Sequence, residues 1–111
     1  MAIIITNANP AELLKEIYKA IDEKKIITWS YDKDKDFTHA TAQWENKAWF
    51  RSKIYDNELR FGIYGQKNIE LTKEIYAIYH GRFIEMLLAH FDSKFGHAIA
   101  TSKKTDPDNF T

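Results

Sequence analysis

Apolar and polar residues alternate over residues 48–64, and this period of two predicts a pair of β-strands. Asp56 and Asn57 lie between the two alternating runs, and both residue types tolerate the positive φ that a type I′ turn needs at its two central positions. We therefore predict a hairpin in which Trp49 lies opposite Tyr64. Its buried face carries the apolar side chains of Phe50, Ile54, Leu59, Phe61 and Ile63. Its other face, which we call the outer hairpin face, carries Trp49, Arg51, Lys53, Tyr55, Arg60 and Tyr64.

Apolar residues recur at helical spacing in two other segments. Asn9 and Pro10 are typical first residues of a helix, and the apolar positions that follow them continue at this spacing to about Lys24. A second helix is predicted over residues 82–95, where apolar residues cover more than half of the circumference. We expect this helix to be buried against the sheet and against one further surface, either the first helix or a second subunit.

Residues 72–80 fit two interpretations. Thr72 is suited to cap a helix that continues to residue 95, but Gly81 would then lie inside that helix and cost about 1 kcal/mol relative to Ala. Isoleucine and tyrosine are frequent in strands, and both faces of residues 74–79 are apolar, as in a central strand. We therefore predict a strand over residues 74–79.

Shorter β-branched or aromatic runs predict further strands at residues 3–5, 26–31 and 37–40. The element order is then helix, four or five mostly antiparallel strands, helix, which predicts an α+β fold with both helices packed on one face of the sheet. Residues 1–101 form a single globular domain in this interpretation. The polar residues 102–111, which include Pro107, form a disordered tail. The opposite face of the sheet is either open or covered by a partner.

Composition narrows the classes of partner. Sixteen basic residues balance sixteen acidic ones, so no long-range field attracts nucleic acid or an acidic membrane, and nucleic-acid binding would need a local patch. The absence of cysteine excludes disulfides, thiolate zinc sites and a cysteine nucleophile. We see no apolar run of membrane-spanning length and no signal-peptide pattern, and we expect a soluble, cytoplasmic protein with no membrane partner.

Metal and cofactor signatures are weak. Asp32, Asp34 and Asp36 have the spacing that opens a calcium-binding loop, but Phe37 stands where the loop needs glycine and Gln43 where it needs a bidentate glutamate. A charged hairpin loop is the favoured interpretation, and a weak surface cation site is the alternative. The four histidines, at positions 39, 80, 90 and 97, lack metal-ligand spacing, and no glycine-rich phosphate loop is present. We expect no metal and no cofactor.

A weak catalytic candidate is formed by His80, Arg82 and Glu85, at the junction of the predicted last strand and last helix. A histidine beside a carboxylate is suited to acid–base chemistry. The alternative is that Arg82 and Glu85 form an ordinary surface ion pair and that His80 hydrogen-bonds a helix end.

The outer hairpin face is the best functional lead. Cations beside aromatic rings on a sheet bind single-stranded nucleic acid, and the same residue types are favoured at protein interfaces. The plainer alternative is a solvated face in which Trp49 and Tyr64 pair across the strands. Our hypothesis is a small non-enzymatic interaction domain that binds a protein partner or itself as a homodimer, through this face or through surplus apolar surface of the last helix. The alternatives are a single-strand nucleic-acid-binding protein and a small enzyme that uses His80 and Glu85.

Overall fold

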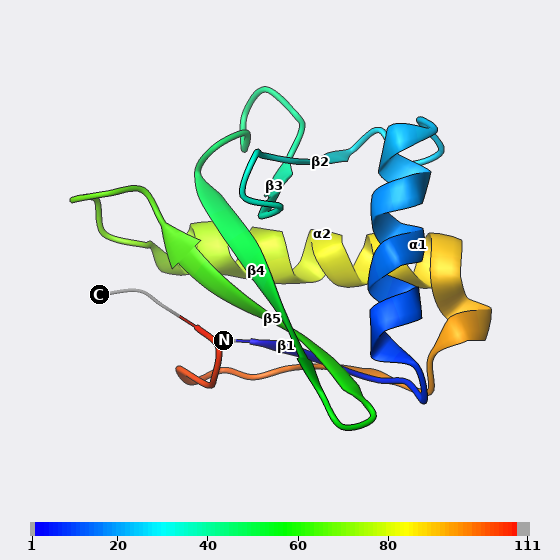
Figure 1. Cartoon of the computed structure of the whole chain (residues 1–111). Helices are drawn as coiled ribbons and strands as arrows, with labels where there is room; N and C mark the ends of the chain where they lie inside the picture. Colours follow the sequence, from blue (N-terminus) through cyan, green and yellow to red (C-terminus); the bar gives the residue numbers. More distant parts are fainter. Residues whose placement is uncertain (1, 109–111) are drawn as a thin grey trace.

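The computed structural model of the chain describes residues 2–108, which form a mixed α+β fold with one antiparallel sheet and two α-helices (Figure 1). In chain order the elements are β1 (Ile3–Thr6), α1 (Pro10–Asp22), β2 (Trp29–Tyr31), β3 (Phe37–His39), β4 (Ala48–Tyr55), β5 (Glu58–Gly65), α2 (Lys73–Phe91), a short 3-10 turn (Asp92–Lys94) and β6 (Ala98–Ala100). The six strands are ordered β2-β3-β4-β5-β1-β6, and each neighbouring pair is antiparallel. Neither helix within the described residues is long and apolar enough to cross a membrane.

The number of strands predicted, four or five, was too low. The sixth strand, β6, has three residues and no alternation, so its sequence carries no strand signal of its own. It forms because β1 presents a free edge to it, and Ile4 pairs with Ile99 at the centre of the short ladder.

The predicted hairpin register is confirmed at every position. Trp49 pairs with Tyr64, Phe50 with Ile63 and Tyr55 with Glu58. The turn type was wrong, because φ is positive at Asn57 (56°) and not at Asp56, whereas a type I′ turn needs both. Register follows from the alternation rather than from the turn, because a slip by one residue would move every apolar side chain to the outer face.

Residues 74–79 belong to helix α2, and the predicted strand is wrong. The Thr72 hydroxyl accepts a hydrogen bond from the Ile75 N–H (3.2 Å) and starts the helix. The helical conformation places Tyr79, Phe83 and other apolar residues on one side, where they are buried in the core. That burial, about 1.5–3 kcal/mol for each large apolar side chain, outweighs the cost of about 1 kcal/mol for glycine at position 81.

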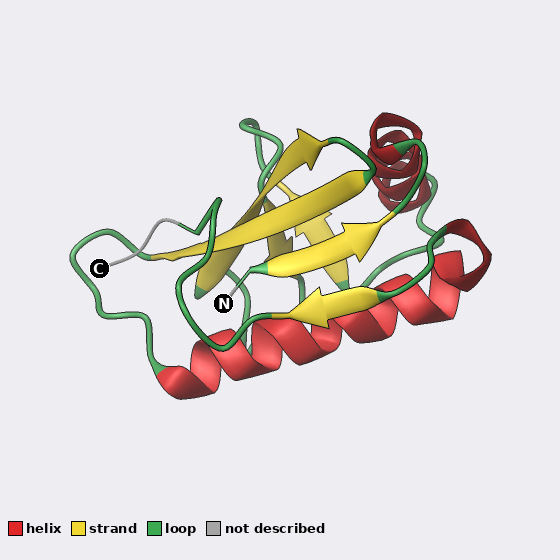
Figure 2. Ribbon diagram, turned by 90° about the horizontal axis from the view of Figure 1, so that it is seen from below, coloured by secondary structure: helices red, strands yellow, loops and turns green. Residues whose placement is uncertain are grey.

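The core is built around the ring of Phe83, and Figure 2 shows α2 running beneath the sheet. The Phe83 ring centroid lies 4.6 Å from that of Phe61 in β5 and 4.9 Å from that of Trp29 in β2. Helix α1 joins this cluster through Tyr18, whose ring stacks on Phe37 with a centroid separation of 4.8 Å. Aromatic side chains from α1, α2 and the four strands β2 to β5 therefore meet in one continuous core.

Ile54 was predicted to be buried, but 49 % of its surface is exposed. It precedes the turn of the β4–β5 hairpin, whose tip extends past both helices (Figure 1). The tip of the hairpin is therefore not covered by the helices, and Ile54 beside it stays exposed.

Residues 105–108 lie against β5. The Asp108 carboxylate accepts hydrogen bonds from the backbone N–H groups of Ile63 (2.8 Å) and Thr105 (2.9 Å). The Pro107 carbonyl carbon lies 2.3 Å from the position that a Cβ at residue 62 would occupy, so only glycine fits at Gly62. The predicted disordered tail also includes residues 109–111, which lie outside the described residues, and the domain boundary at residue 101 stays a prediction.

Candidate functional site

The outer hairpin face is assembled as the strand register requires. Trp49, Arg51, Lys53 and Tyr55 of β4 alternate with the buried residues, and Arg60 and Tyr64 lie opposite them on β5. The Trp49 and Tyr64 rings stack with centroids 5.5 Å apart and planes 19° apart, and both side chains are half-buried. This aromatic pair lies near the end of the face that is away from the turn, and the Arg51 guanidinium lies 5.1 Å from the Tyr64 ring centroid.

A buried carboxylate lies under this aromatic pair. Asp36 immediately precedes β3, opposite Arg51, and its carboxylate oxygens accept bonds from Arg51 Nε (3.1 Å), Arg51 Nη2 (2.8 Å) and the Tyr64 hydroxyl (2.5 Å). The Asp36 side chain is 2 % exposed, whereas that of Arg51 is 57 % exposed. Hydrogen bonding and then the charge of Asp36 raise the pKa of Arg51, and burial followed by the bond to Asp36 raises the pKa of Tyr64.

The charge of Arg60, the second arginine of the face, is also offset by a carboxylate. Arg60 Nε lies 3.0 Å from Glu58 Oε1, and the Arg60 guanidinium covers the Tyr55 ring at 4.5 Å. Lys53 is exposed, and its ammonium lies 5.3 Å from the same ring. The Tyr55 hydroxyl is buried and has no hydrogen-bond partner among the described residues. Two of the three cations on this face therefore have carboxylate partners within residues 2–108.

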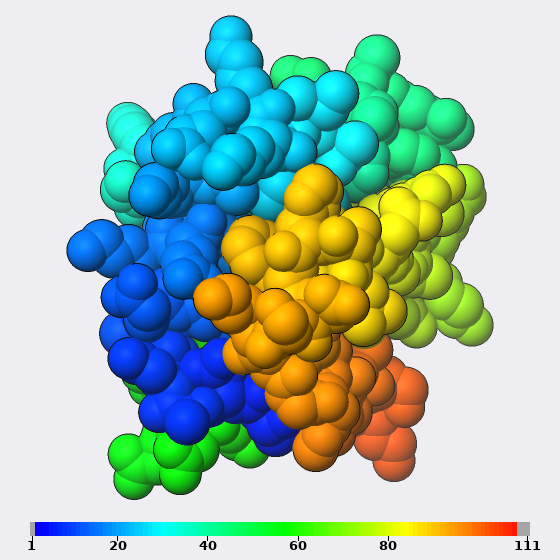
Figure 3. Space-filling model, turned by 90° about the vertical axis from the view of Figure 1, so that its right-hand side faces the viewer, coloured from blue at the N-terminus to red at the C-terminus, as the bar shows by residue number. Residues whose placement is uncertain are grey.

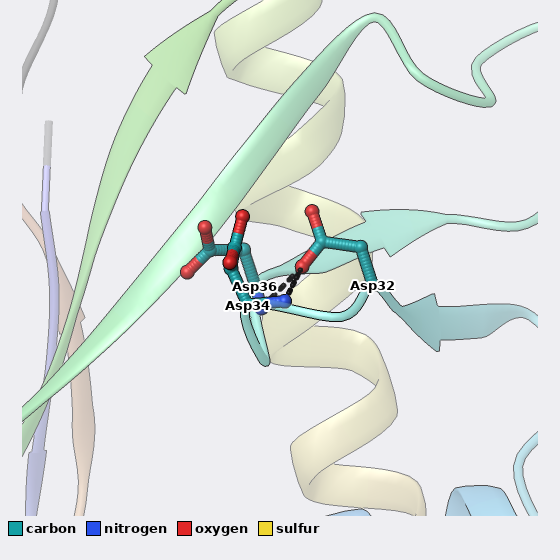
Figure 4. A group of neighbouring side chains, drawn as sticks. All are labelled: Asp32, Asp34 and Asp36. Atoms are coloured by element: carbon teal, nitrogen blue, oxygen red, sulfur yellow. Dashed lines mark hydrogen bonds between the residues drawn. The ribbon is translucent and has the colours of Figure 1, made fainter.

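The three aspartates of the β2–β3 loop are explained by turn chemistry. Their carboxylates come within 4.8 Å of one another (Figure 4). Asp32 Oδ1 accepts hydrogen bonds from the backbone N–H groups of Asp34 (2.9 Å) and Asp36 (3.1 Å), and Lys35 adopts a positive φ of 67°. Asp32 thus stabilises the turn, and Asp36 forms an ion pair with Arg51. A hydrogen-bonded turn therefore explains the spacing of the aspartates.

The predicted catalytic group is divided between two sides of α2. Arg82 and Glu85 form the expected surface pair, with Nη1 and Oε2 3.3 Å apart. His80 is buried elsewhere, with Nδ1 2.6 Å from the Tyr76 carbonyl oxygen and its ring 5.2 Å from that of Phe50. His80 and Glu85 are five residues apart on one helix, whereas side chains that are neighbours on one helix face are three or four positions apart. The proposed acid–base pair therefore loses its geometric basis, because it relied on a strand that ended at residue 79.

A different histidine lies beside Arg82 and Glu85. His39 of β3 lines a pocket of about 330 Å³ together with both residues. Burial, and to a smaller extent the charge of Arg82, lower the pKa of His39 below its ordinary value. Sequence analysis missed this group because position 39 meets positions 82 and 85 only through the tertiary fold. We call it the His39 pocket, and its lining is Thr28, Trp29, His39, Thr41, Gln43, Trp44, Arg82 and Glu85.

A second hollow lies where α1 meets the C-terminal end of α2, and Figure 3 shows these two segments side by side. It encloses about 270 Å³ and is lined largely by alternating lysine and glutamate side chains with His90. Lys94 Nζ and Glu16 Oε1 are 3.9 Å apart within it, a long and solvated pair. The arrangement is typical of a solvated, charged surface between two helices.

Comparison of the chain with protein-family models, curated proteins and solved structures finds no match.

Proposed function

We propose that this chain is a small interaction domain that binds a protein partner through the outer hairpin face. We infer that α1 and α2 both cover the other face of the sheet, which carries the buried residues of the hairpin. Tyr18 of α1 and Phe83 of α2 both contact Phe37, which belongs to the buried core. Among the described residues, the outer hairpin face then lacks a covering helix. Residues 106–108 cover it in part: they lie over Gly62, opposite Arg51, and the Asp106 carbonyl oxygen accepts a hydrogen bond from Arg60. The observation that carries the proposal is the stacked, half-buried Trp49–Tyr64 pair, since tryptophan, tyrosine and arginine are enriched at protein interfaces.

The charge arrangement favours a protein over nucleic acid. A nucleic-acid platform needs cations that are free to pair with phosphates. Here the Arg51 guanidinium is bound by Asp36, and the Arg60 guanidinium is bound by Glu58. These carboxylates already offset the positive charge that would attract a phosphate, and Asp36 is buried too deeply to move into solvent without cost.

The last helix supports the proposal less than its sequence suggests. Its large apolar residues Tyr79, Phe83 and Leu87 are fully buried in the chain's own core. Leu88 is the large apolar residue of α2 that is clearly exposed, and a single exposed leucine is ordinary for a protein surface. The outer hairpin face is therefore the first surface to test, with a second copy of the chain as the first partner.

The experiment is site-specific photo-crosslinking from the aromatic pair of the face. A photoreactive phenylalanine analogue replaces Trp49 in one variant and Lys15, which is exposed on α1, in a matched control. We expect a discrete crosslinked product from position 49, either a dimer of the chain or one heterologous protein, and none from position 15. Equal, diffuse crosslinking from both positions would refute the proposal.

A charge-reversal pair gives an independent measurement. If the product is a dimer, sedimentation velocity should show concentration-dependent association that Lys53→Glu weakens and Lys15→Glu leaves unchanged. The nucleic-acid alternative is tested with the same proteins by fluorescence anisotropy of a labelled single-stranded oligonucleotide at low salt. Salt-dependent binding that Arg51→Ala with Arg60→Ala abolishes would favour that alternative.

A further inference from the structure

The His39 pocket has the composition of a small-ligand site. Its volume, about 330 Å³, is at the lower end of the range of small-molecule pockets. Strands β2 and β3 form one wall, the turn at residues 41–44 forms a second, and α2 forms the third. The half-buried Trp44 supplies apolar surface, with Trp29, which is 2 % exposed, forming part of the floor, while His39, Arg82 and Glu85 supply polar groups. It is separate from the outer hairpin face, with which it shares no lining residue.

The tautomer of His39 is determined by its neighbour Thr41. His39 Nδ1 lies 3.3 Å from the Thr41 backbone nitrogen and 2.9 Å from Thr41 Oγ1. A backbone N–H only donates, so Nδ1 accepts, and in a neutral imidazole the proton is then on Nε2. The ring is held in place by Trp29, at a centroid distance of 4.9 Å. His39 thus presents a fixed N–H donor that Thr41 does not use.

Arg82 supplies the second donor group. Its Nη1 contacts both oxygens of Glu85, at 3.4 and 3.3 Å, and the side chains are 54 % and 66 % exposed. Such a pair is screened by solvent and exchanges readily. A guanidinium has five N–H donors in a planar fork, so most of the donors of Arg82 are available when Nη1 contacts Glu85. The contact with Glu85 shows that the Arg82 guanidinium can donate hydrogen bonds to a carboxylate.

We propose that the His39 pocket binds a small organic carboxylate with a flat apolar body. The carboxylate is held by the Arg82 guanidinium and by His39 Nε2–H, and the apolar body lies against the indole ring of Trp44, beside the buried Trp29. A carboxylate matches the fork in planar, bidentate geometry, which a spherical anion does not. Glu85 competes with the ligand for Arg82 and therefore weakens binding.

The test uses benzoate as the probe and the full chain as the protein. Titration is followed by the indole N–H signals of the three tryptophans in ¹H–¹⁵N NMR spectra. We expect saturable shifts at Trp29 and Trp44 and none at Trp49, which lies on the outer hairpin face. Arg82→Gln should weaken affinity roughly tenfold, because a charge-assisted, bidentate contact is lost. Glu85→Gln should strengthen affinity several-fold, because the competing carboxylate is gone.

Three controls make the result specific. Lys73→Gln removes one charge from the same helix outside the pocket and should leave benzoate affinity unchanged. His39→Phe keeps a ring but removes the donor, and should weaken binding in the same direction as Arg82→Gln. Benzyl alcohol, which has the body without the carboxylate, and inorganic phosphate, which has charge without the body, should both bind more weakly than benzoate.

Specific outcomes overturn the inference. Absence of saturable shifts at benzoate concentrations up to about 10 mM would exclude even weak binding. Equal affinity in wild type and Arg82→Gln would remove the assigned donor. Weaker binding in Glu85→Gln would show that Glu85 contributes to the site rather than competing, which contradicts the proposed role. Tighter binding of phosphate than of benzoate would reject the ligand class.

Discussion

Replacing Arg51 by methionine tests how much the stability of the folded protein depends on the ion pair between Arg51 and the buried Asp36 carboxylate. Arg51 is 57 % exposed, but Asp36, to which it donates two hydrogen bonds, is 2 % exposed. Arg51→Met leaves a buried carboxylate with the Tyr64 hydroxyl as its remaining side-chain donor. Removing one partner of a buried pair costs about 3 kcal/mol or more, because the other charge stays desolvated.

The reciprocal change, Asp36→Ala, should cost less. It leaves a cation that is already half in solvent and free to hydrate, so the loss is that of its hydrogen bonds alone, about 2 kcal/mol. The double variant Asp36→Ala with Arg51→Met removes both charges and should be more stable than the sum of the two losses predicts, by about 1–2 kcal/mol. The asymmetry between the single variants is the specific consequence of their unequal burial.

Urea unfolding followed by tryptophan fluorescence measures these differences, provided that the slope with urea concentration stays constant among the variants. Arg82→Met is the matched control, because its partner Glu85 is exposed and the loss should be below about 0.5 kcal/mol. If Arg51→Met costs no more than Arg82→Met, or if the two single losses are equal and additive, the buried-carboxylate reasoning is wrong.

Three further predictions concern single residues. Gly81→Ala should stabilise the protein by about 1 kcal/mol in urea unfolding, because a Cβ there meets no atom within 4 Å and α2 gains helix propensity; destabilisation would contradict the open site. Gly62→Ala should detach residues 105–108 from β5, because the new Cβ would overlap the Pro107 backbone. Faster amide hydrogen exchange at Asp108 and Ile63 would show the detachment, and unchanged exchange would refute the contact between Pro107 and Gly62. His39 has a lowered pKa, so the folded state binds a proton there more weakly than the unfolded chain does. Its contribution to stability is therefore present above the ordinary pKa of 6.5 and is lost as the pH falls through the lower, folded-state value. His39→Gln should reduce this acid-side loss, and an unchanged pH profile of unfolding would contradict the assignment.

The predictions that succeeded rest on local periodicity. Alternation over β4 and β5 determined which side chains share a face, since a strand has a period of two and one face must be buried. Asn9 and Pro10 likewise marked the start of α1, because a cap acts on backbone groups only three residues away. The α+β class followed from these elements.

Residues 72–80 show why local pattern was insufficient elsewhere. Isoleucine and tyrosine favour strands, and Gly81 disfavours a helix, so both propensity arguments pointed away from the observed α2. Burial of Tyr79 against Trp29, with ring centroids 5.5 Å apart, and of Phe83 against Phe61 contributes more than either propensity. That contribution depends on residues 22 and 50 positions away and is not visible in the segment itself.

The sequence by itself determined the hairpin, its register and the composition of its outer face, because these depend on neighbours along the chain. Only the tertiary structure decided that Asp36 neutralises Arg51, and that His39 rather than His80 lies beside Arg82 and Glu85. Both outcomes arise where short strands and a helix from distant parts of the sequence pack together. The physical reason is that burial and charge pairing act through space, whereas periodicity and capping act along the chain.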